Sequence, residues 1–139
     1  MTTHDVTTEV LVTGAGASGR GRTTLLRLSW READPLAVTL LITPHPDHPS
    51  LPRGRWVVLR DFLRYGLEEP TGDGDVRIRP DTRAGLVHLT LARDGPPCRV
   101  NILHSVLRQF LTATEVVVPT GEEASSAAID ALLERLLRR

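Results

Sequence analysis

The stretch TTLLRLSWREADPLAVTLLI, residues 23–42, contains two apolar patterns of the kind that form β-strands. From Leu26 to Trp30, apolar and polar residues alternate, which is the period of a half-buried strand. The run LAVTLLI from Leu36 to Ile42 is almost wholly apolar, as a more deeply buried strand would be. Between them, Asp34-Pro35 favours a turn, because proline restricts the residue that precedes it. The stretch therefore predicts an antiparallel hairpin.

A glycine-rich segment before this hairpin imitates a cofactor loop. Gly14, Gly16 and Gly19 spell G-x-G-x-x-G behind an apolar run, as in dinucleotide-binding folds. That loop needs a helix beginning at its third glycine, because the helix N-terminus binds the pyrophosphate. Here a strand pattern follows instead, and the chain contains no lysine for a phosphate loop. We therefore predict that Gly14–Gly21 is a flexible connector and that the protein takes no cofactor.

The remaining periodicity predicts four strands, a short helix, three strands and two helices, in that order. The predicted strands cover residues 6–13, 23–30, 36–42, 55–59, 76–79, 85–92 and 97–103, and the predicted helices cover 59–67, 103–111 and 129–137. We expect Gly66 to end the first helix in a left-handed conformation. Strand hairpins followed by helices are typical of an antiparallel α+β domain, not of alternating βαβ units.

Length and composition indicate one globular domain over residues 1–139. Residues 1–22 would supply the N-terminal strand and the connector, and residues 23–139 the core. The 17 Lys+Arg, all of them Arg, balance 17 Asp+Glu, so no overall charge attracts nucleic acid or an anionic membrane. A single cysteine excludes an internal disulfide and favours the cytoplasm. No apolar run is long enough to span a membrane.

Several residues have a spacing found in metal or catalytic sites, but each is better explained as structure. His45 and His48 lie among prolines that prevent the helical turn needed to bring both imidazoles to one metal. The GDGD of Gly72–Asp75 lacks the further ligands of an EF-hand. Ser105 lacks a nucleophile elbow, and Cys98 lies at an inward strand position. We expect no metal site and no catalytic site.

Five motifs follow one another in an order that resembles a known family. They are DPLAV (34–38), WVVLRDFLRYGL (56–67), PTGDGDVRIRP (70–80), FLTATEVVVPTGEE (110–123) and DALLERLL (130–137). Each motif alone is weak, but five in one order and spacing are specific. On these motifs the chain from Leu28 to Leu137 resembles the SsgA-like proteins of sporulating actinomycetes. The exclusive use of arginine fits the high-GC genomes of that group.

The resemblance marks the motif residues as structural or partner-binding positions. They are Asp34, Pro35, Trp56, Arg60, Asp61, Gly66, Gly72, Gly74, Asp75, Val76, Arg77, Pro80, Phe110, Leu111, Pro119, Gly121 and Glu123. The sequence also departs from the family pattern, with Leu36 in place of the usual Tyr and Ala113 where the family often has Arg. These departures bear on the choice of partner more than on the fold.

The resemblance implies a non-enzymatic adaptor or regulator of sporulation-specific cell division. Such a protein is cytoplasmic, is recruited to division septa, and binds the division ring of FtsZ or the septal peptidoglycan machinery. The resemblance further implies two packed antiparallel sheets with flanking helices, similar to the whirly fold, and a homo-oligomer, specifically a trimer.

Single-stranded nucleic-acid binding is a second hypothesis, which rests on the likeness to the whirly fold alone. It requires a basic groove with aromatic rings on which bases stack. Aromatic residues make up only 4% of the chain, and we expect only Tyr65 and Trp56 to be available at the surface. Nucleic acid is therefore disfavoured as a partner. A cofactor-dependent enzyme is a third hypothesis, with less support than either.

Overall fold

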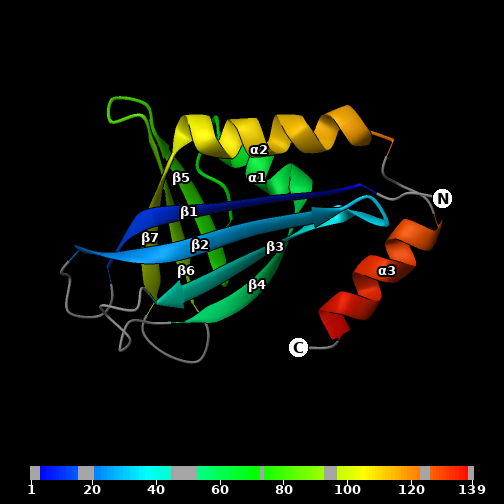
Figure 1. Cartoon of the computed structure of the whole chain (residues 1–139), viewed down its shortest axis with the longest axis horizontal. Helices are drawn as coiled ribbons and strands as arrows, with labels where there is room; N and C mark the ends of the chain where they lie inside the picture. The colour runs from blue at the N-terminus through cyan, green and yellow to red at the C-terminus, as the bar shows by residue number, and fades with distance from the viewer. Residues whose placement is uncertain are drawn as a thin grey trace.

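The computed structural model describes residues 4–15, 21–44, 53–72, 74–92, 97–122 and 126–137. Within these residues, seven strands form one antiparallel sheet in the order β4-β3-β2-β1-β7-β6-β5, with three helices around it (Figure 1). The strands are β1 (Asp5–Ala15), β2 (Gly21–Arg31), β3 (Asp34–Pro44), β4 (Gly54–Leu59), β5 (Val76–Asp81), β6 (Leu86–Leu91) and β7 (Cys98–Leu103). The helices are α1 (Arg60–Gly66), α2 (His104–Val117) and α3 (Ser126–Leu137). The predicted α+β class and the predicted order of elements are confirmed.

The sheet has two halves that meet at a short seam. One half contains β4, β3, β2 and β1, and the other contains β7, β6 and β5. Strand β1 pairs with β7 only at Thr13↔Asn101, Gly14↔Val100 and Ala15↔Arg99. Because so few pairs join the halves, the sheet can curl, and β5–β7 run across the direction of β1–β4 (Figure 1). The two sheets implied by the family resemblance are the two halves of this curled sheet.

The two ends of the predicted glycine-rich connector lie in the hairpin of β1 and β2. Strands β1 and β2 pair continuously from Asp5↔Arg31 to Ala15↔Gly21, so Gly14 and Gly21 lie in strands. The remaining part of that prediction, residues 16–20, lies outside the described residues. The backbone hydrogen bonds of the hairpin thus extend further than the side-chain alternation indicated.

The core fills the space between the two halves of the sheet and the helices. Alternate residues of the strands point into it, including Leu26, Leu28 and Trp30 of β2, Val87, Leu89 and Leu91 of β6, and Cys98, Val100 and Ile102 of β7. Helix α2 adds Leu107, Phe110 and Leu111 from above. Burial of apolar surface from both halves stabilises the curl.

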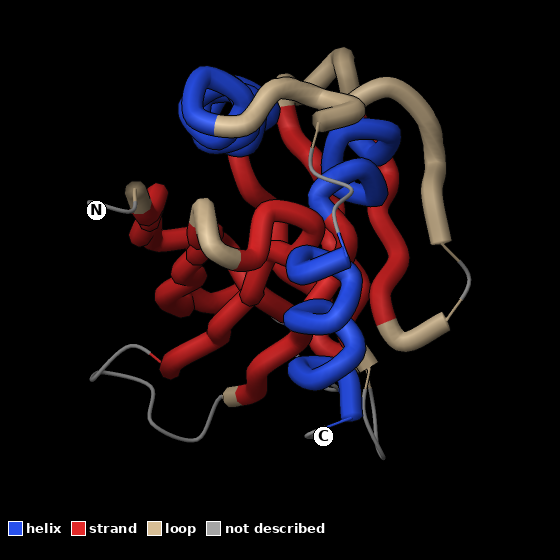
Figure 2. Tube along the Cα trace, turned by 90° about the vertical axis from the view of Figure 1, so that its right-hand side faces the viewer, coloured by secondary structure: helices blue, strands red, loops and turns tan. Residues whose placement is uncertain are grey.

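The helices cover different parts of the sheet. Helix α2 extends along the upper edge in Figure 1 and contacts β1 and β7, whereas α1 lies against β3, β4 and β5. Helix α3 packs on β3, and Figure 2 shows it in front of the strands with α2 seen end-on above. Among the described residues, no helix has the length and apolar character needed to cross a membrane.

Gly66 ends α1 for a reason that differs from the prediction. The described glycines with a positive φ are Gly72, Gly85 and Gly121, so the predicted left-handed conformation of Gly66 was wrong. A Cβ atom at Gly66 would lie 2.4 Å from Cγ2 of Ile78 on β5. Glycine is needed here because α1 packs closely against β5, not because the helix requires a left-handed cap.

Candidate functional site

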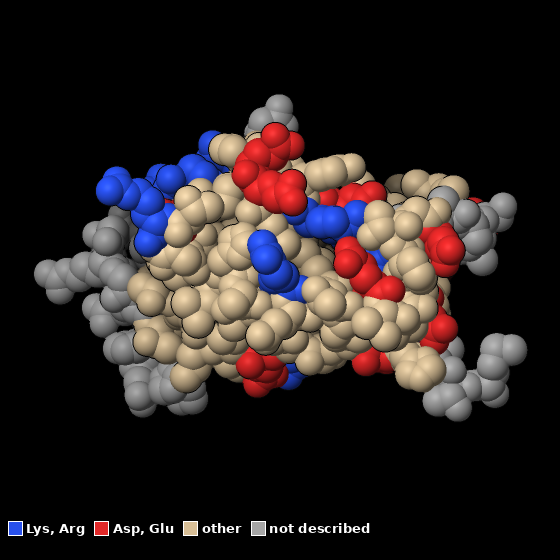
Figure 3. All heavy atoms as spheres, turned by 90° about the horizontal axis from the view of Figure 1, so that it is seen from above, with Lys and Arg blue, Asp and Glu red and all other residues tan. Residues whose placement is uncertain are grey.

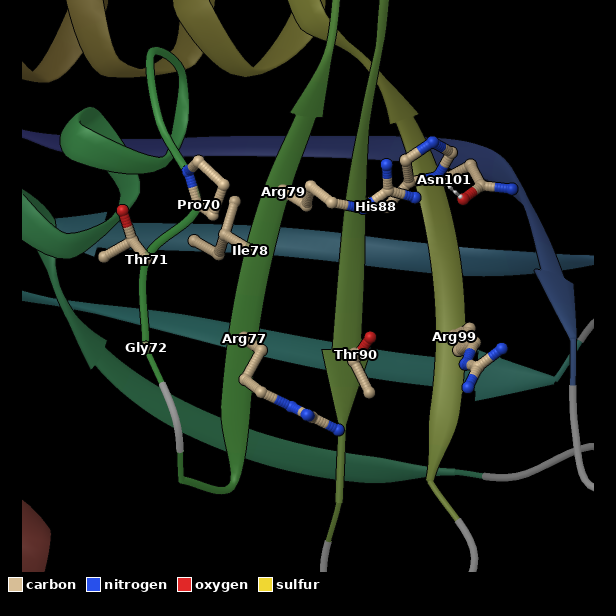
Figure 4. A pocket seen from close by; sticks show the side chains of 10 residues that line it. All are labelled: Pro70, Thr71, Gly72, Arg77, Ile78, Arg79, His88, Thr90, Arg99 and Asn101. Carbon is tan, nitrogen blue, oxygen red and sulfur yellow. Dashed lines mark hydrogen bonds between the residues drawn. The ribbon is translucent and has the colours of Figure 1, made fainter.

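The outward side of β5, β6 and β7 is hollowed into a pocket of about 570 Å³ (Figure 4). Its polar character follows from strand alternation, because the residues between the buried apolar positions must point outward. The outward positions that line the pocket are Arg77, Arg79, His88, Thr90, Arg99 and Asn101. We call these six residues the arginine face.

Antiparallel pairing arranges the arginine face in two rows across three strands. Arg77 of β5 is paired with Thr90 of β6, which is paired in turn with Arg99 of β7. Arg79, His88 and Asn101 form the second row in the same way. Neighbouring strands lie about 4.8 Å apart, and residues two apart along a strand lie about 6.8 Å apart. Figure 4 shows Arg77 and Arg99 on either side of Thr90.

His88 is held between two oxygen atoms. Its Nδ1 contacts Oδ1 of Asn101, and its Nε2 lies 3.2 Å from Oδ2 of Asp81. The hydrogen bond with His88 lowers the pKa of the Asp81 carboxyl, and a hydrogen bond from the Ala84 backbone N–H lowers it further. The two contacts lie on opposite sides of the imidazole and hold the ring in place. The second row is therefore orientated by its own hydrogen bonds.

The lowered pKa of Asp81 predicts a pH-dependent contribution to stability. A depressed folded-state pKa means that the carboxylate stabilises the fold above its ordinary pKa of 3.8, and that this contribution disappears as the pH falls below it. We expect the melting temperature of wild type to exceed that of Asp81→Asn at about pH 6, and this difference to shrink as the pH falls below 3.8. Thermal melts across this range measure the difference. A gap that stays constant with pH would contradict the assignment.

The arginine face carries positive charge that its described surroundings do not neutralise. Neither Arg77 nor Arg99 has an ion pair or a side-chain hydrogen bond with any residue in the described part of the chain. Arg79 lies near Asp81, and its charge contributes to lowering the pKa of that carboxyl. By contrast, Arg27 pairs with Glu9 at 2.8 Å. Figure 3 shows basic side chains at one end and in the middle of the face seen from above, with acidic side chains at its upper and lower edges and toward the other end.

Comparison with known proteins identifies the family. The family model described as "Streptomyces sporulation and cell division protein, SsgA" matches residues 25–123. The chain belongs to the SsgA family. The sporulation-specific cell division protein SsgB of Salinispora tropica is 37% identical over 112 residues, covering 79% of this chain and 77% of that protein. SsgB of Thermobifida fusca is 32% identical over 107 residues, covering 76% and 75%.

Solved structures of SsgA-family proteins share the fold. An SsgA-like sporulation-specific cell division protein from Thermobifida fusca superposes with a TM-score of 0.76 at 25% identity, covering 99% of this chain and 97% of that one. A chain from work on SsgB mutations and longitudinal cell division in Streptomyces coelicolor gives 0.74 at 28% identity, covering 86% and 93%. The family resemblance seen in the five sequence motifs is confirmed.

Asp34 and Pro35 of the first SsgA-family motif connect elements that are distant in sequence. Asp34 is 4% exposed, and its Oδ2 accepts a hydrogen bond from Nη1 of Arg135 at 2.7 Å. Arg135 also donates to the hydroxyl of Thr39. The Pro35 carbonyl accepts a hydrogen bond from the Trp30 indole at 2.9 Å. These contacts attach α3 to β3 and fix the β2–β3 turn.

The second SsgA-family motif places a cation inside the protein. Arg60 is 1% exposed, and its guanidinium carbon lies 5.5 Å from the centroid of the Trp30 ring. Its Nη1 donates to the Thr114 hydroxyl at 3.3 Å, which links α1 to α2. The neighbouring Asp61 pairs with Arg64 on the same helix. Arg60 is thus part of the framework, whereas Asp61 lies at the surface of α1.

The aromatic residues of the described chain are mostly inside. Tyr65 is 55% exposed, as expected. Trp56 is 4% exposed, so the expectation that it is available at the surface was wrong. It lies at an inward position of β4, and its indole donates to the Ala92 carbonyl at 3.3 Å. Trp30 and Phe110 are also buried.

The other motif residues lie in the core, at turns and in the pocket. Val76, Phe110, Leu111 and Gly66 are buried, Pro80 is half-buried, and Gly74, Asp75, Pro119 and Gly121 are exposed. Gly72 and Arg77 line the pocket. Glu123 lies outside the described residues, as do His45 and His48.

The structure also describes Cys98, which the sequence analysis assigned to the core, and the side chains that could hold a metal. Cys98 is buried, and burial raises the pKa of its thiol. Within the described residues, no group of three or more His, Cys, Asp or Glu side chains is placed to hold a metal.

Sequence reasoning missed most of the arginine face. Arg79, His88, Thr90, Arg99 and Asn101 come from three strands, and none of them belongs to the residues singled out above. Alternation with the apolar Val76 and Ile78 indicates that Arg77 and Arg79 share one side of β5. The strand register that brings β7 residues beside them carries no local signal in the sequence.

Proposed function

We propose that this SsgA-family protein is a non-enzymatic adaptor of sporulation-specific cell division. In this role it is a cytoplasmic protein that is recruited to division septa and binds FtsZ or the septal peptidoglycan machinery. The observation that carries the proposal is the family match over residues 25–123, together with relatives named sporulation-specific cell division proteins. Because many motif residues are buried, partner binding is assigned to exposed surfaces such as the arginine face.

Affinity capture from a sporulating actinomycete tests this function. The tagged protein is used as bait, and a lysate from vegetative growth with the same bait is the control. We expect FtsZ or septal wall-synthesis proteins among the retained proteins, enriched in the sporulating sample. A binding assay with purified FtsZ then distinguishes a direct partner from a protein that is retained through another protein. Single-stranded nucleic acid that is retained after a wash at moderate salt would favour the second hypothesis.

An apolar stripe on α3 supports the expected homo-oligomer. The exposed side chains of Ile129, Leu133, Leu136 and Leu137 recur at helical spacing along α3. Exposed apolar stripes of this kind commonly mark association surfaces. Closed rotational symmetry would bury the stripe and repeat the partner-binding surface, so that weak contacts add through avidity. The trimer is favoured by the family resemblance alone.

Self-association predicts a measurable change in mass. Light scattering coupled to size exclusion is expected to give wild type a mass well above the 15.3 kDa of the chain. The double variant Leu133→Ser/Leu137→Ser is expected to elute as a monomer, because it interrupts the α3 stripe. Leu11→Ser, which alters an equally exposed leucine on β1, is the matched control and should keep the wild-type mass. A monomeric wild type would remove the avidity argument.

A further inference from the structure

We propose that the arginine face binds an extended acidic segment of a partner protein, with carboxylates at alternate positions of that segment. The inference rests on the proposed function to the extent that an adaptor has a protein partner. It names the surface of this chain on which that partner docks, and the chemistry of the partner segment that binds there. The site is formed by β5, β6 and β7 and faces away from the core (Figure 4).

The positive charge of the arginine face favours an anionic ligand. Three guanidinium groups are concentrated on one small face, and Asp81 is the carboxylate that the described structure places beside them. Within the described residues, the charges of Arg77 and Arg99 have no counterion. Guanidinium groups recognise carboxylates through two parallel hydrogen bonds, which gives geometric specificity as well as attraction. The hydroxyl of Thr90 lies between the two arginines and offers a further hydrogen bond.

The spacing of the two rows matches an extended peptide. Arg77 and Arg79 are two residues apart on β5, so the rows are separated by about 6.8 Å. Side chains on one side of an extended peptide repeat at the same interval. A peptide lying along β6 would therefore place one carboxylate between Arg77 and Arg99, and the next between Arg79 and His88. The site thus selects an alternating pattern of acidic residues, and not merely negative charge.

The same surface is poorly suited to single-stranded nucleic acid. Base stacking requires exposed aromatic rings, and the rings of Trp30, Trp56 and Phe110 are buried in this structure. Among the described residues that line the pocket, none is Phe, Trp or Tyr, so bases have no ring to stack on there.

Fluorescence anisotropy with defined probes tests the proposal. The main probe is a labelled nine-residue peptide with Glu at positions two, four, six and eight and Ser or Gly between them. A peptide of the same composition with four contiguous Glu residues tests the spacing. Labelled oligo(dT) of about fifteen nucleotides, near the upper end of the site size of one OB fold, tests nucleic acid. We expect saturable binding of the alternating peptide, several-fold tighter than that of the contiguous one, and weaker at high salt.

Two variants with the same charge change locate the binding site. Arg77→Gln/Arg99→Gln removes both arginines of the first row and is expected to weaken peptide binding more than tenfold. Arg31→Gln/Arg108→Gln removes two exposed arginines outside the pocket and should stay within about twofold of wild type, because only the overall charge changes. Thermal melting of Arg77→Gln/Arg99→Gln should equal or exceed that of wild type, since like charges are removed. A structural role for the arginines would lower it.

Thr90→Glu provides an independent variant if the first one is destabilised. It places a carboxylate of the chain itself between Arg77 and Arg99, and it should abolish peptide binding by occupying the site. Absence of saturable peptide binding, equal affinity of the alternating and contiguous peptides, or wild-type affinity in Thr90→Glu would overturn the proposal. Binding of oligo(dT) that is tighter than peptide binding and is lost in Arg77→Gln/Arg99→Gln would reassign the face to nucleic acid.

The failure of this inference can be distinguished from the failure of the proposed function. If wild type and Arg77→Gln/Arg99→Gln capture FtsZ or wall-synthesis proteins equally, the adaptor function stands and the arginine face is not the docking site. If the acidic peptide binds at the arginine face but the full chain captures no division protein, the site stands and the adaptor function fails.

Discussion

Replacing Arg135 with methionine is expected to lower the free energy of unfolding by about 3–5 kcal/mol, because it leaves a buried carboxylate without its partner. The side chain of Asp34 is only 6% exposed, and the Arg135 guanidinium lies 2.7 Å from it. Methionine keeps most of the length of the arginine side chain but none of its charge. Since Arg135 is the basic residue in the last turn of α3, the loss should fall on the attachment of that helix to β3. Denaturant unfolding and hydrogen exchange of α3 measure both effects.

A second substitution distinguishes an ion pair from simple packing. Replacing both partners, as in Asp34→Asn/Arg135→Met, should restore part of the lost stability, because the uncompensated charge is then removed as well. Arg108→Met is the matched control at an exposed position of α2 and should change stability by less than about 0.5 kcal/mol. Stability of Arg135→Met within that margin would show that the pair contributes nothing. Release of α3 should also weaken self-association, because the apolar stripe is on the same helix.

The fold could be predicted to the extent that it is encoded locally. Alternation from Leu26 to Trp30 and the apolar run that follows Pro35 predicted the β2–β3 hairpin, and helical spacing predicted the first part of α2, up to Leu111. Gly66 was assigned the wrong role because its neighbour Ile78 is distant in sequence. The same holds for Trp56, whose indole partner, Ala92, lies on the far side of the curled sheet.

The candidate site could be predicted only in part. Arg77 was identified from the family motif, and alternation with the apolar Val76 and Ile78 indicates that Arg79 faces the same way. Arg99 is placed beside them by the register of β6 with β5 and β7, which depends on pairing along whole strands. A period of two determines which side of the sheet a residue faces, but not which residue lies opposite. The partnership of Asp34 with Arg135, 101 residues later, was likewise beyond local reasoning.

The family motifs identify the fold because many of their residues are buried and hold it together. Asp34, Pro35, Trp56 and Arg60 hold turns, helices and the curl of the sheet together. A sequence motif made of such residues identifies the framework. On the proposal made above, a partner is recognised by outward residues of β5–β7, where a substitution costs little stability and changes the surface chemistry directly.

Substituting alanine for Arg60 is expected to destabilise the protein by about 3–5 kcal/mol, as for other large side chains removed from a core. Arg60 is 1% exposed, lies over the Trp30 ring and donates to Thr114, so it joins α1, β2 and α2. Alanine would leave a cavity at this junction and remove the cation–π contact, which can contribute about 2 kcal/mol when desolvated. Arg108→Ala, the same change on the exposed side of α2, should stay within about 0.5 kcal/mol of wild type.

A double-mutant cycle separates the two contributions of Arg60. The cycle combines Arg60→Ala with Trp30→Leu, and equilibrium unfolding of the four proteins gives the coupling energy between the two side chains. We expect a coupling of about 1–2 kcal/mol if the guanidinium is held by the ring, with the rest of the loss due to packing. Purely additive effects would mean that Arg60 stabilises the junction by filling space and by its hydrogen bonds alone. In either case the buried cation of Arg60 is part of the framework that joins α1, β2 and α2.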